Sequence, residues 1–151
     1  MDLRPELSPP PVGRQRLDEL CAEVERIAGL LETGSEAAVG AIAAFNAATG
    51  HAYEALDFAE YEGSRSLEEF AREAARPARP VVADITRDEL VEIVRRLLTG
   101  APESDHHLRL LEANVRHPRV RGLIFDPPAH LADASAEQLV EEALAYRPIE
   151  L

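Results

Sequence analysis

The fold of this chain is decided by one stretch, Ile85-Thr86-Arg87-Asp88-Glu89-Leu90-Val91-Glu92-Ile93-Val94-Arg95-Arg96-Leu97-Leu98. Its apolar residues recur at spacings of three and four, which is typical of an amphipathic helix. Thr86 stands three residues before Glu89, the spacing of a capping box, and Gly100 offers a left-handed stop. The stretch therefore predicts a helix with a sharp start and a sharp end.

Similar patterns predict helices over most of the remaining chain. They cover 17–33, the alanine-rich segment 37–48, 66–75 and 104–116, with a last helix opening at Ser135. In the segment 37–48 the expected inward stripe is Val39, Ile42 and Phe45. Residues 53–61 are expected to be irregular, and 122–125 to form a short turn. No alternation of β-branched residues indicates a strand, so we expect an all-α fold.

The order of these elements indicates an internal duplication. Asp18-Glu19-Leu20 matches Asp88-Glu89-Leu90, and Leu56-Asp57-Phe58 matches Leu123-Ile124-Phe125. The prolines in residues 1–15 predict a flexible tail there, and Arg76-Pro77-Ala78-Arg79-Pro80 indicates a linker. We therefore expect a tail over 1–15, two tandem four-helix units over 16–76 and 84–151, and a linker over 77–83.

Composition limits the classes of function. The chain has 151 residues and a formal net charge of −12. No apolar stretch approaches the ~20 residues of a spanning helix, and the N-terminus lacks a signal-peptide pattern, so a cytoplasmic location without membrane contact is expected. A phosphate-binding surface needs a basic excess, which argues against direct nucleic-acid binding. The acidity either aids solubility or favours a basic protein partner.

Catalytic and metal-binding patterns are weak. Cys21 falls at an apolar helical position, which favours a buried core thiol over a reactive one. His106 and His107 are adjacent and diverge by ~100° around a helix, so they cannot form the i, i+4 ligand pair of a metal site. No nucleophile motif or phosphate-binding loop is present. We expect neither an enzyme nor a bound metal or cofactor.

A second stretch adds a resemblance. His117-Pro118-Arg119-Val120-Arg121-Gly122-Leu123-Ile124-Phe125-Asp126-Pro127-Pro128 places a His-Pro turn before an apolar, aromatic-bearing stub that runs into proline. Together with the capped helix upstream, it resembles the small four-helix immunity proteins that neutralise nuclease bacteriocins of the colicin and pyocin type. The resemblance covers 84–147 directly and 17–76 only through the duplication, whose N-terminal copy is degenerate.

The resemblance implies a binding surface on two elements. In that family the second helix gives partner specificity, and the short third element supplies shared anchor residues. Here the family's aspartate falls on Gly122, and its two aromatic positions fall on Phe125 and Asp126, so the anchors differ. The implied partner-binding residues are Asp105, Leu108, Arg109, Glu112, Arg121, Leu123, Phe125 and Asp126.

Two functions remain open at this point. The resemblance implies a non-catalytic inhibitor that binds a cognate basic toxin, a nuclease bacteriocin, and that is a monomer or weak dimer. The alternative is a helical interaction or structural module that binds an endogenous partner. Phe125 is equally compatible with a binding hot spot and with a core plug.

Overall fold

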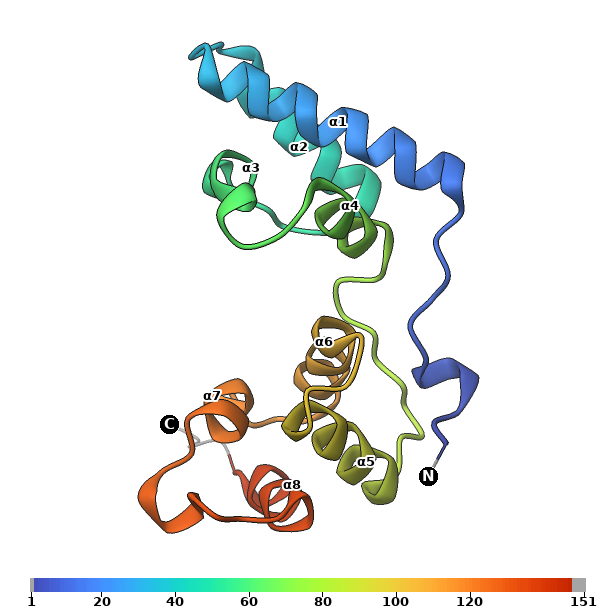
Figure 1. Cartoon of the computed structure of the whole chain (residues 1–151), viewed down its shortest axis with the longest axis vertical. Helices are drawn as coiled ribbons and strands as arrows, with labels where there is room; N and C mark the ends of the chain where they lie inside the picture. The colour runs from blue at the N-terminus through green and yellow to red at the C-terminus, as the bar shows by residue number, and fades with distance from the viewer. Residues whose placement is uncertain (1, 148–151) are drawn as a thin grey trace. The chain divides into compact units, whose positions relative to one another are not determined.

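The computed structural model describes residues 2–147, and within them all regular structure is helical (Figure 1). The all-α prediction is therefore confirmed. The contacts divide the chain into two compact units: residues 10–78 form one, and residues 79–147 together with 2–9 form the other. Each unit is described by itself.

The N-terminal unit is built around its first helix. Helix α1 (Arg14–Glu32) contacts α2 (Ala37–Thr49), α3 (Ala55–Glu60) and α4 (Leu67–Ala75), and the short 3-10 turn η2 (Tyr61–Gly63) joins the last two (Figure 1). Helix α2 ends where Gly50 adopts a left-handed conformation, with φ of 75°. The fourth helix, α4, begins with a capping box at Ser66 and packs against α1.

Aromatic side chains fill the core of this unit. Phe58 and Phe70 are almost completely buried, and their ring centroids lie 5.3 Å apart. Phe45 meets Phe58 edge-on at 5.2 Å, and Tyr61 meets Phe70 edge-on at 5.4 Å. Edge-to-face contacts of this kind add to the hydrophobic gain from burial. Segment 53–61, expected to be irregular, contains α3 because Glu54 and Asp57 form a capping box at its start.

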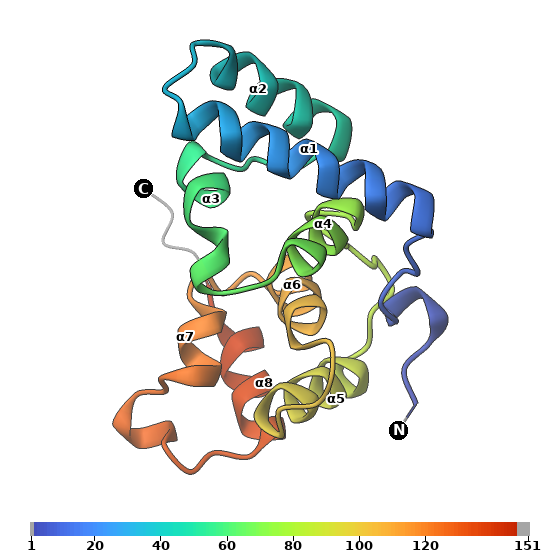
Figure 2. The same ribbon diagram turned by 45° about the horizontal axis from the view of Figure 1, so that its top comes forward.

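The C-terminal unit is built around the helix that the stretch 85–98 forms. Helix α5 (Arg87–Leu98) contacts α6 (Ser104–Asn114), α7 (Val120–Phe125) and α8 (Ala136–Ala145) (Figure 2). A 3-10 turn, η3 (Ala129–Leu131), lies between α7 and α8. The predicted capping box is present: the Glu89 amide donates to Thr86 Oγ1 at 3.1 Å, and the Thr86 amide donates to Glu89 Oε1 at 2.9 Å. This helix begins where the sequence predicted.

The N-terminal segment differs from the tail expected over residues 1–15. A 3-10 turn, η1 (Pro5–Leu7), places Leu7 in the core of the C-terminal unit with none of its surface exposed. His106 Nε2 lies 2.9 Å from the Leu7 carbonyl oxygen, and α1 already begins at Arg14. The prolines exclude regular α-helix here, but they allow a short turn that buries one leucine.

The expected linker over 77–83 lies partly inside the C-terminal unit. The Val82 amide donates to Asn114 Oδ1 at 2.8 Å, and Asn114 Nδ2 donates to the Pro80 carbonyl at 3.0 Å. One asparagine side chain thus holds both backbone groups of the segment against α6. Among residues 2–147, no helix combines the length and hydropathy that a membrane span requires.

Candidate functional site

The candidate site lies on α6, on α7 and on the turn that joins them. Helix α6 buries Leu110 and Leu111, and α7 buries Val120 and Ile124. These four side chains hold both elements against α5 through the core of the unit. The opposite faces of α6 and α7 are free to present other side chains to solvent.

The structure separates the predicted partner-binding residues into two groups. Leu108 and Leu123 are 8% and 6% exposed and belong to the core of the unit, so they offer little surface to a partner. Apolar spacing alone could not show which turn of each helix faces inward. The exposed group contains Asp105, Glu112, Arg121, Phe125 and Asp126, and Arg109 is half-buried.

Phe125 is the large apolar residue of this surface. Its side chain is 54% exposed, whereas the neighbouring Ile124 is 4% exposed. The Asp126 amide donates to the Gly122 carbonyl at 2.7 Å, which closes the last turn of α7. Of the two interpretations open from sequence, the core plug is excluded. An exposed aromatic side chain on a short, rigid helix can contribute a large contact area with a partner at low entropic cost.

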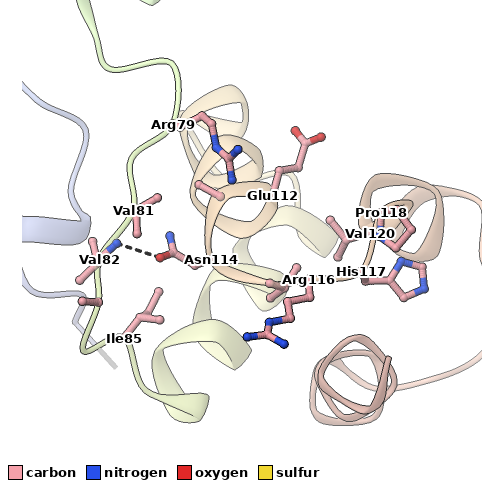
Figure 3. A pocket seen from close by; sticks show the side chains of 13 residues that line it. Arg79, Val81, Val82, Ile85, Glu112, Asn114, Arg116, His117, Pro118 and Val120 are labelled. Carbon is pink, nitrogen blue, oxygen red and sulfur yellow. Dashed lines mark hydrogen bonds between the residues drawn. The ribbon is translucent and has the colours of Figure 1, made fainter. Parts of the chain in front are cut away.

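An open groove adjoins this surface, and the sequence analysis missed it. Its volume is about 780 Å³, and it is bounded by segment 79–85 on one side and by the end of α6 and the His-Pro turn on the other (Figure 3). Val81, Val82 and Val115 supply apolar lining. Arg79, Arg116 and Glu112 are exposed residues that also line it.

The local charge differs from that of the whole chain. Within residues 2–147, the guanidinium groups of four exposed arginines in or next to the groove form no ion pair; they are Arg79, Arg116, Arg119 and Arg121. By contrast, Arg14, Arg87 and Arg95 each contact a carboxylate. Three of the four fall in the run Arg116-His117-Pro118-Arg119-Val120-Arg121, a basic cluster in an acidic chain that was visible in the sequence.

Two buried histidines lie behind the site on α6. His106 and His107 are 6% and 3% exposed, and neither His107 ring nitrogen has a hydrogen-bond partner in the described part of the chain. Burial lowers the pKa of His107, and the nearby His106 and Arg96 lower it further. Across residues 2–147, no group of three or more His, Cys, Asp or Glu side chains is arranged to hold a metal ion.

Cys21 was expected to be a core thiol and is only partly buried. It packs against the core of the N-terminal unit, and burial together with Asp18 raises the pKa of its thiol. A raised pKa lowers the fraction of reactive thiolate at neutral pH. The residue therefore offers no support for redox or nucleophilic chemistry.

Fold and surface together define a small all-α domain that exposes Phe125 and several charged side chains on α6 and α7. Residues 82–148 match the family model described as colicin immunity protein / pyocin immunity protein. This part of the chain therefore matches the colicin/pyocin immunity protein domain, and the match supports a role in bacteriocin immunity.

The other comparisons gave no match. No curated protein and no solved structure is similar to this chain at the threshold applied. The family match begins at residue 82. It therefore includes neither the N-terminal unit, residues 10–78, nor the segment 2–9 that belongs to the C-terminal unit.

Proposed function

We propose that the chain is a cytoplasmic immunity protein that binds a cognate bacteriocin toxin and neutralises it without chemistry of its own. The toxin proposed is a nuclease, and the immunity protein acts as a monomer or weak dimer. The observation that carries the proposal is the exposure of Phe125 on α7 inside the matched domain. Such a ring, next to buried neighbours, is suited to anchor a partner.

The charged residues around Phe125 supply selectivity in this proposal. Asp105 and Glu112 are exposed on α6, and Asp126 follows α7. Carboxylates at such positions pair with basic side chains of a partner and exclude partners with the wrong charge pattern. Leu108 and Leu123 act only by holding the two helices in place.

The N-terminal unit is proposed to be a degenerate second copy of the immunity domain. In both units the first helix contacts the three helices that follow, and the fourth begins with a capping box. Helix α2, at the position of the specificity helix, carries no charged residue. An uncharged helix cannot provide charge-based selectivity, so this unit is assigned no share in toxin binding.

Protection of cells tests the function. The chain is co-expressed with the toxin encoded by a neighbouring gene, and growth and nucleic-acid cleavage are measured. The proposal expects growth to be restored by the wild type and lost with Phe125→Ala, while the helical signal of the variant stays unchanged. A chain that fails to protect would favour the alternative, a helical module with an endogenous partner. Protection from a toxin that cuts no nucleic acid would contradict only the nuclease assignment.

A further inference from the structure

We propose that the groove between segment 79–85 and the α6–α7 turn binds a short acidic peptide segment of another protein. The groove lies beside the toxin-binding surface and shares only Glu112 with it. Its volume of about 780 Å³ falls within the ~300–1,000 Å³ of ordinary ligand sites. The proposal therefore adds a second binding site to the immunity domain.

The groove is lined and flanked by positively charged side chains. Arg79 and Arg116 line the groove from its two sides (Figure 3). Next to it, Arg119 directly precedes α7 and Arg121 lies in the first turn of α7. Their guanidinium groups form no ion pair within residues 2–147. Acidic residues are abundant in this chain, yet none of them pairs with these arginines in the described residues. The four guanidinium groups are therefore available to bind carboxylates of another molecule.

The walls of the groove are fixed by side-chain contacts. Asn114 lies between the walls, and its side chain holds the backbone of Pro80 and Val82 while also donating to the Leu110 carbonyl at 2.8 Å. On the opposite side, the His117 ring packs against Tyr146 with centroids 5.3 Å apart. A groove whose walls are already fixed loses little entropy when a ligand binds.

The lining favours a peptide over a nucleic acid. Val81, Val82 and Val115 offer contacts for aliphatic side chains, and the one ring in the lining, His117, already packs against Tyr146. Bases bind single-strand sites chiefly by stacking on free aromatic rings. A peptide that alternates carboxylates with aliphatic side chains matches both the arginines and the valines.

Glu112 makes a specific contribution to this arrangement. Its carboxylate lines the same groove and repels an acidic ligand. Removing that charge should therefore strengthen binding, whereas removing Arg79 and Arg116 should weaken it. Opposite effects from neighbouring residues are not expected of a merely unstable variant.

The experiment uses the full chain and a fluorescent peptide of about seven residues that alternates glutamate with leucine, a length that spans about 20 Å when extended. Anisotropy is measured for the wild type, for Arg79→Gln/Arg116→Gln, and for Glu112→Gln. The control is Arg16→Gln/Arg26→Gln, which changes the net charge equally at two N-terminal-unit arginines that already contact acids. Further probes are the same peptide with glutamine for glutamate and a thymidine oligonucleotide.

The expected result is binding of the acidic peptide that weakens about tenfold or more in Arg79→Gln/Arg116→Gln, strengthens in Glu112→Gln, and is unchanged in the control. The glutamine peptide should not bind measurably. The proposal is overturned if the wild type does not bind the acidic peptide, if the control loses as much affinity as the groove variant, or if the oligonucleotide binds with the same arginine dependence and the peptide does not.

Discussion

Arg4 holds both carboxylate oxygens of Glu89, a residue 85 positions further along the chain. Its Nε donates to Oε2 at 2.6 Å and its Nη2 donates to Oε1 at 2.9 Å. Arg4 also contacts Asp84 at 3.0 Å, and Leu7 is fully buried a few residues away. The N-terminal segment is therefore a structural part of the C-terminal unit, although the family match begins only at residue 82.

Arg4→Gln should destabilise α5, because Glu89 is 5% exposed and would lose its charged partner. Arg14→Gln is the control, since that arginine also pairs with two acids but lies largely in solvent. Hydrogen exchange of the α5 amides reports the loss. Equal protection in the two variants would show that the segment adds no stability.

The same pair predicts an acid-sensitive stability. Arg4 holds the pKa of the Glu89 carboxyl below the usual value of 4.5, so its contribution is present above 4.5 and is lost as the pH falls through the folded-state pKa. In Arg4→Gln, the free energy of unfolding should depend less on pH in this range. An unchanged acid slope would contradict the pairing.

His107 predicts a second, separate pH window. Its pKa in the folded chain is lowered from 6.5 by burial, so the unfolded chain takes up a proton first as the pH falls. The free energy of unfolding should therefore decline below pH 6.5 until the folded-state pKa is reached. The charged or titratable neighbours that act on it are His106, Arg96 and Glu103.

The variant His107→Leu should remove this decline and raise stability at neutral pH, because it replaces a buried imidazole, whose ring nitrogens have no hydrogen-bond partner within residues 2–147, by an apolar side chain. His130→Leu is the control, since His130 is exposed. Urea unfolding at about pH 7.5 and about pH 5 makes the comparison. A profile of His107→Leu that parallels the wild type would exclude His107 as the source of the slope.

Phe70→Ala tests the independence of the N-terminal unit. Phe70 contacts three other aromatic rings and has Arg65 stacked at 4.2 Å, so its loss should cost that unit about 3–5 kcal/mol. Toxin affinity should stay the same, because the proposed surface lies in the other unit. Circular dichroism and titration calorimetry on the same sample measure both. A parallel loss of affinity would assign the N-terminal unit a part in binding.

Exposed carboxylates should control how fast the toxin associates. Asp105→Asn/Asp126→Asn should slow association several-fold at low salt and leave the unfolding midpoint unchanged, since both residues are exposed. Glu32→Gln/Glu62→Gln changes the net charge equally in the N-terminal unit and should have less effect. Stopped-flow association rates across a salt series measure this. Equal slowing in both pairs would mean that only net charge matters.

Helix starts were readable from the sequence because capping is local. Ser66, Thr86 and Ser135 each accept a hydrogen bond from the third residue of the helix that follows, as their spacing predicted. Ser104, the first residue of the helix predicted over 104–116, lies inside α6 and donates to the Ala101 carbonyl at 2.9 Å. Glu103 takes the cap position instead, with φ of 67°.

Burial was less readable because it depends on tertiary contacts. Val39 was placed on the inner stripe of α2 and is 78% exposed, since a helix rich in alanine has no distinct apolar face. Leu7 was assigned to a tail because nothing nearby in sequence shows the core of the C-terminal unit, in which it is buried. Phe125 and Phe58 occupy matched sequence positions, yet one is 54% and the other 1% exposed.

In the proposed function, Phe125 anchors the toxin. Phe125→Ala should weaken toxin affinity by about 2 kcal/mol, roughly 30-fold, and should shift the free energy of unfolding by less than about 0.5 kcal/mol because the ring is largely in solvent. Ile124→Ala is the matched control: it should lose about 2–4 kcal/mol of stability while the folded fraction keeps its affinity. Stability and affinity measured on both variants decide the matter, and unchanged affinity in a folded Phe125→Ala variant would contradict the account.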